Sequence, residues 1–297
     1  MALIDRGLNL SNFDETTPEE VEAFKLHYAS WDGRSHIGLN TFLENRPDAL
    51  KRYRLFGHFL ATAPTTAVTP ENAAEQEVDG NRTGSFGLIW FYGMLGFTAG
   101  VAYVVRNKQM YGYTKDQCWE GMSVAFLYGG PRTMESVANA LEGYEWTEPA
   151  HPPRFHGAWA PDPDAFRSGL DFSSPDLTPA ELRLLEDWYQ RAIGYVPRHV
   201  GFMAEVHPQL LKAYRNRYEH CLVTLPKQVM PATLLSIQLH RQDREGIREN
   251  LHLARAFGMA REEVLHALYN VLLYGGMETA TLFDEVGGDL LRRWDEE

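Results

Sequence analysis

Apolar and polar residues follow one another along most of this chain with the spacing of helices that bury one face. Runs of alternating β-branched residues closed by Asn-Gly or Asp-Gly, which indicate β-hairpins, are almost absent. Helix starts with a capping threonine followed by proline occur at Thr17 and Thr178. Gly112 and the pair Gly129-Gly130 are predicted C-terminal stops. The other predicted helices cover 46–61, 85–95, 98–111 and 115–128. The pattern predicts an all-α protein.

The chain also contains an internal repeat. A constant offset of 146 positions aligns 97–137 with 243–283 without a gap. This offset pairs Gly112 with Gly258, and it pairs two Leu-Tyr-Gly-Gly runs. Because the period is close to half of the 297 residues, the match predicts two fused copies of one module rather than a solenoid.

The repeat divides the chain into three segments, which are a first, degenerate module at 1–143, a proline-rich linker at 144–178 and a second module at 179–297. The front of the second module echoes that of the first, since the helix that starts at Pro208 resembles the one that starts at Pro47. Ala, Thr, Pro, Asn and Gly fill 62–84, which predicts a long loop inserted in the first copy.

Composition narrows the classes of partner. A hydrophobic content of 44% and a charged content of 23% are ordinary for a globular protein, and the net charge of −12 disfavours nucleic acid. The N-terminus lacks a basic region followed by an apolar run, so no signal peptide is predicted. Glycines interrupt the apolar stretch 86–105, which favours a buried helix pair over a membrane span. Cys118 and Cys221 form no disulfide framework, and we expect a cytoplasmic protein.

Several motifs in the second half occur in a characteristic order. They are His207-Pro208-Gln209-Leu210-Leu211, Leu225-Pro226, Ala254-Arg255-Ala256-Phe257-Gly258 and the ending Tyr274-Gly275-Gly276-Met277-Glu278-Thr279-Ala280. This order resembles the carboxymuconolactone decarboxylase and alkylhydroperoxidase D (AhpD) superfamily. The resemblance implies two tandem AhpD-like helical modules related by a pseudo-twofold axis. It also implies a homo-oligomer, with a trimer as one form, because single-module relatives form dimers and then threefold rings.

The departures from the family pattern limit the chemistry. Where the peroxidase branch has Cys-x-x-Cys and a following His, this chain has Asp243, Gly246 and Asn250. The glutamate of the decarboxylase branch corresponds to Pro231. The sequence therefore excludes a thiol peroxidase, and we expect no cofactor. The resemblance implies a fold and the location of a pocket, without a mechanism.

The pocket that the resemblance implies falls at an unusually polar stretch of the second copy. His240 with Asp243 or Glu245 would make an oriented base, because a carboxylate fixes the imidazole tautomer. Arg241 or Arg244 would hold a substrate carboxylate in a bidentate fork. The matching stretch of the first copy is almost entirely apolar. The alternative is a charged helix end exposed to solvent, with ion pairs that contribute little.

Tyrosines are the next candidates. Tyr128 and Tyr274 occupy equivalent positions before the double glycines, where a phenol could donate to a developing enolate or simply pack at a helix end. Tyr92 and Asn250 complete the predicted substrate-binding residues. Glu249 is a further candidate, as are its neighbours Arg248 and His252. The histidines of the front helices, which are His36, His58, His199 and His220, lack the spacing of metal ligands, so no metal is expected.

Together these features predict a cofactor-independent lyase, decarboxylase or isomerase-type enzyme. Its substrate would be a small carboxylate or carbonyl metabolite, and its chemistry acid–base catalysis. The alternative is a non-catalytic binding or structural paralogue that has retained the fold. An enzyme should gather His240, an acid and an arginine at one closed cavity, whereas a relic should direct these side chains into solvent.

Overall fold

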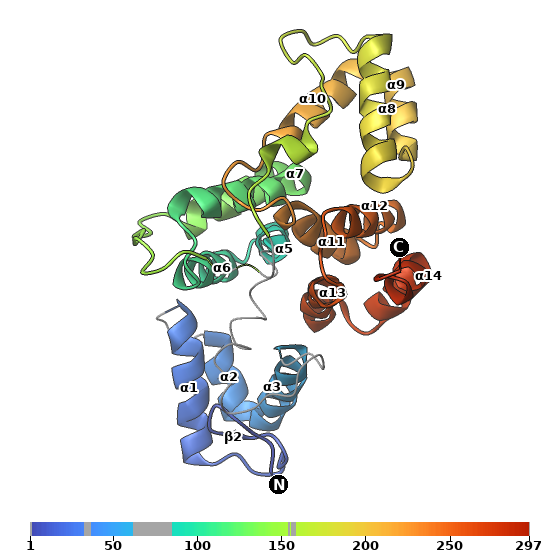
Figure 1. Ribbon diagram of the computed structural model, residues 1–297. Coiled ribbons are helices and arrows are strands. Elements are labelled where there is room, and N and C mark those ends of the chain that lie inside the picture. Colours follow the sequence, from blue (N-terminus) through green and yellow to red (C-terminus); the bar gives the residue numbers. More distant parts are fainter. Residues whose placement is uncertain (1, 33–36, 62–84, 154, 156–158, 297) are drawn as a thin grey trace.

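The computed structural model describes residues 2–32, 37–61, 85–153, 155 and 159–296 (Figure 1). Helices dominate these residues, which confirms the prediction of an all-α protein. The strands of the described part are β1 (Ile4–Asp5) and β2 (Leu8–Asn9), which form an antiparallel hairpin near the N-terminus. The loop predicted at 62–84 lies outside the described residues, as does His36.

Among the described residues, the helices of the first half form two groups of three. They are α1 (Pro18–Asp32), α2 (Ile37–Asn45) and α3 (Pro47–Ala61), followed by α5 (Gly87–Leu95), α6 (Thr98–Met110) and α7 (Lys115–Ala140). The threonine cap predicted at Thr17 is present, because the Glu20 N–H donates to its Oγ1 at 3.3 Å and the Thr17 N–H donates to the Glu20 carboxylate at 3.0 Å. Reciprocal bonds of this kind satisfy two amides of the first turn that have no partner inside the helix.

The last helix of the first half continues past its predicted stop. The sequence predicts an end before Gly129, yet α7 extends to Ala140 with a kink at Gly130. Gly130 has φ 54° and ψ −150°, a conformation that is open essentially only to glycine. The next residue is Pro131, which suits the first turn of a new helical stretch. The glycine therefore bends the chain, and the proline restarts the helix.

The second half repeats this order. After the short 3₁₀ turn η1 (Pro163–Phe166) come α8 (Pro179–Ile193), α9 (Arg198–Val206), α10 (Pro208–Glu219), α11 (Val229–Arg241), α12 (Arg244–Ala256), α13 (Arg261–Gly275) and α14 (Glu278–Arg292). The helix start predicted at Thr178 is confirmed by a capping box with Glu181.

Backbone features recur at the 146-residue offset of the sequence repeat. Helices α6 and α12 begin and end 146 positions apart. Gly96 and Gln242, which precede them, are both left-handed, with φ of 70° and 56°. The kink at Gly130 corresponds to Gly276, where φ is 75° and the chain passes from α13 to α14. Because Gln242 is not a glycine, its left-handed conformation is maintained by the surrounding fold.

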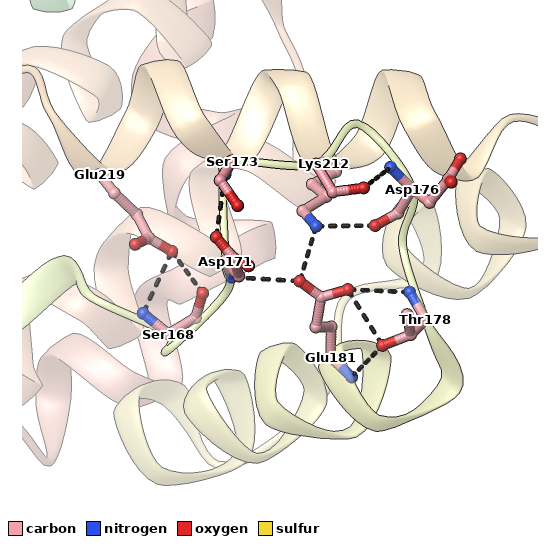
Figure 2. A network of polar contacts seen from close by, with 9 residues as sticks. Ser168, Asp171, Ser173, Asp176, Thr178, Glu181, Lys212 and Glu219 are labelled. Atoms are coloured by element: carbon pink, nitrogen blue, oxygen red, sulfur yellow. Dashed lines mark hydrogen bonds and ion pairs between the residues drawn. The ribbon is translucent and has the colours of Figure 1, made fainter.

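The first three helices of each half, α1–α3 and α8–α10, recur at an offset of 161 positions, and we call them the front helices. A buried lysine lies at the centre of the second set. Lys212 on α10 donates to the Asp176 carbonyl oxygen at 2.7 Å and pairs with Glu181 at 2.6 Å (Figure 2). The same Glu181 carboxylate closes the capping box with Thr178. One network thus joins the loop before α8, the start of α8 and the middle of α10.

The first copy contains the same network. Lys51 on α3 is buried, donates to the Glu15 carbonyl oxygen at 2.9 Å and pairs with Glu20 at 2.8 Å. Each of these three residues precedes its counterpart in the second copy by 161 positions. The equivalence of the front helices, faint in the sequence, is therefore clear in their contacts.

The remaining helices of both halves, α5–α7 and α11–α14, share one hydrophobic core, in which α5 packs against α11. The front helices cover this core from two sides: α1 packs on α6 and α8 packs on α12 (Figure 1). Each front group also crosses to the other half, since α3 contacts α13 and α10 contacts α7. Residues from both halves consequently meet at two places on the core.

The linker packs on this core with aromatic side chains. Trp159 and Phe166 are buried, and the Trp159 Nε1–H donates to the Glu263 carboxylate at 3.3 Å. Cys118 and Cys221 are both buried free thiols whose pKa burial raises to about 12. Over the part of the chain that the structure describes, no helix is long and apolar enough to cross a membrane.

Candidate functional site

His240 lies near the end of α11 with its ring against aromatic side chains of α5. Its Nδ1 is 2.9 Å from the Ser236 carbonyl oxygen, and its ring centroid is 4.4 Å from that of Phe91 and 6.3 Å from that of Trp90. Burial lowers the pKa of His240, while the hydrogen bond to Ser236 acts in the opposite direction. Because a carbonyl oxygen can only accept, Nδ1 carries the proton and Nε2 holds the basic lone pair. Nε2 is buried without a hydrogen-bond partner.

The residues at the positions of the family's cysteines and histidine have local structural contacts. Asp243 caps α12, where its Oδ1 accepts from the Gly246 N–H at 3.1 Å. Asn250 is buried, and its Nδ2 donates to the Gly246 carbonyl oxygen at 2.8 Å. An N-cap carboxylate satisfies backbone amides at the positive end of the helix dipole. These contacts account for both side chains without a ligand.

The remaining polar residues of this stretch extend from the surface. Arg244 pairs with Glu285 at 2.7 Å, and Glu245 pairs with Arg248 at 3.3 Å, with all four side chains about half exposed. No hydrogen bond or ion pair within the described chain joins His240 to Asp243 or Glu245. The predicted combination of base, acid and anchor is thus spread over a helix end instead of converging on His240.

Three of the predicted residues meet at a cluster between the halves, which we name the Tyr274 cluster (Tyr53, Phe91, Tyr92, His240 and Tyr274). The hydroxyls of Tyr92 and Tyr274 are hydrogen bonded to each other. Phe91 lies between Tyr274 and His240, with ring centroids 5.0 and 4.4 Å away. Burial raises the pKa of both phenols, which therefore stay protonated near neutral pH.

Two other predicted residues belong to a second cluster, which we name the Glu249 cluster (Tyr128, His199, Tyr214, Arg241 and Glu249). The Tyr128 and Tyr214 hydroxyls are 2.9 Å apart, and the guanidinium carbon of Arg241 lies 5.2 Å from the Tyr128 ring centroid. The His199 Nδ1 lies 4.0 Å from the Glu249 carboxylate. Helices α7, α9, α10, α11 and α12 each contribute one residue to this cluster.

Glu249 carries a strongly perturbed carboxyl. Its pKa is raised from 4.5 to about 7, chiefly because burial removes the carboxylate from water, and the charges of Asp243 and Glu245 add to the rise. The guanidinium of Arg215 opposes it. Glu249 in turn raises the pKa of five surrounding tyrosines, which are Tyr128, Tyr189, Tyr195, Tyr214 and Tyr218.

Arg215 supplies the buried positive charge beside this carboxyl. Its guanidinium carbon lies 3.9 Å from the Trp188 ring centroid, and its Nε donates to the Glu219 carboxylate at 2.7 Å. Because Arg215 is already paired with Glu219, it offsets only part of the desolvation of Glu249. A carboxyl with a pKa of about 7 can both release and accept a proton near neutral pH.

The two clusters divide the predicted site residues between them. Tyr92, Tyr274 and His240 meet in one, Tyr128 and Arg241 in the other, and Asp243 acts electrostatically on Glu249 from the α12 cap. Sequence reasoning gave Glu249 only secondary rank and treated His199 as a rejected metal ligand. A usable signal was present: α8 and α10 carry three tyrosines, an unusual density next to a helix with an acid on its inner face.

Among the described residues, no group of three His, Cys, Asp or Glu side chains converges as metal ligands. No known protein family, curated protein or solved structure matches the chain. What the protein does must therefore be inferred from the residues themselves.

Proposed function

We propose that this protein is a cofactor-independent enzyme of the lyase, decarboxylase or isomerase type. It would move a proton on a small carboxylate or carbonyl metabolite at the Glu249 cluster. The observation that carries the proposal is the Glu249 carboxyl, which is largely removed from water among tyrosines, with the His199 Nδ1 4.0 Å away. General acid–base catalysis is most effective when the pKa of the catalytic group lies near the working pH.

The neighbours of Glu249 suit the remaining tasks. Arg241 is exposed beside Tyr128 and makes no ion pair within the described chain, so its guanidinium is available to a substrate carboxylate. Tyr128 and Tyr214 share one hydrogen bond, which leaves one of their two hydroxyl protons for an enolate oxygen. Because burial raises the pKa of Tyr128 to about 12, this phenol donates without ionising.

We propose further that the fold is a tandem of two AhpD-like modules about a pseudo-twofold axis. In support, α1 packs on α6 as α8 packs on α12, and α3 crosses to α13 as α10 crosses to α7. The association of the chain into a homo-oligomer, with a trimer as one form, and its cytoplasmic location stay predictions. Light scattering that gives the mass of one chain at micromolar concentration would contradict the oligomer.

The runner-up is a non-catalytic binding or structural paralogue. Two observations favour it: Asp243 and Asn250, which stand where the family has reactive residues, are bound within their own helix. In addition, Arg244 and Glu245 make ion pairs at the surface. The paralogue would bind a ligand at the Glu249 cluster without transforming it.

Proton transfer can be tested before the natural substrate is known. The protein is incubated in deuterated water with a panel of α-keto and β-keto acids, and NMR follows deuterium entering carbon-bound positions and the loss of carbon dioxide. We expect Glu249→Gln to lower the rate by about 10²–10⁴-fold, the size of a positioned acid or base. The rate of the unmodified protein should titrate at a pH of about 7.

Glu205→Gln is the matched control, because it removes an exposed acid of α9 that contributes nothing to the raised pKa of Glu249. Its rate should stay within about twofold of the unmodified protein. Full activity in Glu249→Gln would contradict the assignment. Compounds that raise the melting temperature without any exchange would instead favour the binding paralogue. His240→Ala tests the site predicted from sequence. We expect this variant to lower the melting temperature, because the His240 ring packs on Phe91, and to leave the exchange rate largely unchanged.

A further inference from the structure

The Tyr274 cluster occupies the position in the first half that the Glu249 cluster occupies in the second. Tyr274 precedes the double glycine of α13 as Tyr128 precedes that of α7, at an offset of 146. Tyr53 on α3 corresponds to Tyr214 on α10, at the offset of 161. Tyr128 bonds to Tyr214 at 2.9 Å, and Tyr274 offsets part of the burial-induced rise in the pKa of Tyr53, so the two phenols of the first half also lie close together.

The charged residues around Glu249 have uncharged counterparts at the Tyr274 cluster. The 146-residue offset pairs Leu95 with Arg241, Phe97 with Asp243, and Tyr103 with Glu249. Tyr103 is half-buried, and burial raises its pKa, so it stays neutral. The same place in the fold thus has a charged lining in one half and an apolar, phenolic lining in the other.

The apolar lining is accessible from outside. Leu95 is 61% exposed and Phe97 is 38% exposed, while Tyr53 and Tyr274 retain 42% and 37%. Large apolar side chains gathered beside polar groups at a junction of helices are typical of sites for small molecules rather than of an inert surface.

The phenols provide a directed hydrogen-bond donor within this lining. Each hydroxyl has one proton, and the bond between Tyr92 and Tyr274 uses only one of their two protons. If Tyr53 accepts the second proton, its own hydroxyl becomes the terminal donor, at the exposed end of the row. In either arrangement one O–H remains for a ligand acceptor, and no phenolate forms near neutral pH.

We propose that the Tyr274 cluster is a second ligand site, for a neutral aromatic molecule that bears a carbonyl oxygen. The rings of Phe97, Phe91 and Tyr92 would contact the aromatic part, and the terminal phenol O–H would donate to the carbonyl. We expect an uncharged ligand because the guanidinium of Arg54, which lowers the pKa of Tyr53, is already paired with Asp5 at 2.7 Å. Arg6 acts on Tyr103 from the N-terminal hairpin.

This inference goes beyond the proposed function, because binding at the Tyr274 cluster needs no proton transfer by Glu249. It gives the duplication a physical meaning: divergence has produced two sites of opposite polarity from one module. The charged site takes an anionic metabolite, and the phenolic site takes a neutral aromatic one.

Prodan, a neutral fluorescent naphthyl ketone, is a suitable probe. Its emission shifts to the blue in apolar surroundings and responds to hydrogen bonds at its carbonyl. The test variant is Phe97→Asp, which installs the residue of the other copy. Phe97 is at the N-cap position of α6 and makes no capping bond, so an aspartate there can cap the helix as Asp243 caps α12. Folding should consequently survive the exchange, which circular dichroism checks.

We expect the unmodified protein to bind Prodan with a blue shift, and Phe97→Asp to weaken binding at least tenfold. Tyr92→Phe, which shortens the phenol row, should weaken it about three- to tenfold and reduce the carbonyl-dependent part of the shift. Phe202→Ala is the matched control, since Phe202 is an exposed phenylalanine of α9, a helix that contributes no residue to the Tyr274 cluster. Glu249→Gln should leave Prodan binding unchanged, although it abolishes proton transfer.

The inference is overturned if the unmodified protein does not bind Prodan, or if Phe97→Asp binds it as well as the unmodified protein. An equal loss in Phe202→Ala would show that the probe adheres to exposed apolar side chains in general. Loss in Glu249→Gln alone would place the probe at the other cluster. Should Phe97→Asp fail to fold, unchanged binding in Tyr92→Phe overturns the inference by itself.

Discussion

At the scale of single residues, neighbours far away in sequence decide the chemistry of a side chain. Glu245 and Glu249 lie one turn apart on α12, yet the first pairs with Arg248 at the surface and the second is buried. The sequence shows two glutamates on a charged helix, and nothing local distinguishes them. Tyrosines of α7, α8 and α10 and the paired Arg215 make the difference.

The first prediction concerns stability against pH. The carboxyl of Glu249 has a pKa of 4.5 before folding and about 7 after it. Between these values the folded state holds a proton that the unfolded state has released, so this group lowers the free energy of unfolding as pH rises through the window. The full effect is at most about 3 kcal/mol above pH 7. Glu249→Gln should remove this fall, as urea unfolding at pH 5 and pH 8 would show.

Glu205→Gln serves as the control for this measurement, because an exposed carboxyl has little to gain or lose on folding. Its stability should follow the pH dependence of the unmodified protein. If the stability of Glu249→Gln varies with pH as that of the unmodified protein does, the pKa of the Glu249 carboxyl is not raised on folding.

At the scale of elements, glycines define where the long helices bend. Gly130 has φ 54° and ψ −150°, and no atom lies within 4 Å of the place where a Cβ would stand. Gly130→Ala should therefore destabilise the protein through backbone strain alone, by about 1–3 kcal/mol. Gly201 lies inside α9 with equally open space and an ordinary helical conformation. Gly201→Ala should stabilise it by about 0.4–1 kcal/mol. Thermal unfolding with opposite signs for the two variants checks this prediction, and equal signs contradict it.

The buried lysine networks fix the front helices, and their strength can be compared with that of a surface pair. Lys212 is buried against Glu181, and its removal leaves a carboxylate without its partner, so Lys212→Ala should cost about 3–5 kcal/mol. Lys227 pairs with Asp162 nearer the surface at 2.9 Å, and Lys227→Ala should cost less than about 1 kcal/mol. Chemical unfolding of both variants gives the comparison; similar losses would show that the buried pair is no stronger.

The Lys212 pair also has a pH signature. Its ammonium, together with the bonds from Thr178, lowers the pKa of Glu181 from 4.5 to about 2. A carboxyl with a lowered folded pKa contributes stability above the unfolded value and loses it as pH falls toward the folded one. Since the Glu181 side chain is partly exposed, solvent reduces this contribution. In Lys212→Ala the loss of stability as pH falls from 4.5 toward 2 should be smaller, because only the bonds from Thr178 then lower the pKa.

At the scale of the whole molecule, the halves are interlocked. The core is continuous from α5 to α11, and α3 and α10 each pack on a helix of the other half. We expect one cooperative thermal transition, because no half buries its own apolar faces completely. A fragment of residues 144–297 should show helical content without sharp unfolding, measured by circular dichroism. Two separate calorimetric transitions in the full chain would contradict the shared core.

The sequence by itself determined the helical fold, the caps at Thr17 and Thr178, and the repeat at 146 positions, because propensity, capping and periodicity are local properties. It also named Glu249 on α12 as a further candidate, without a reason to prefer it to Glu245. Only the tertiary structure decided that the His240 ring packs on Phe91 and that Glu249 is buried, since burial depends on which distant helices meet. Desolvation raises the pKa of Glu249, and the spacing of residues along α12 does not show which tyrosines of other helices surround it.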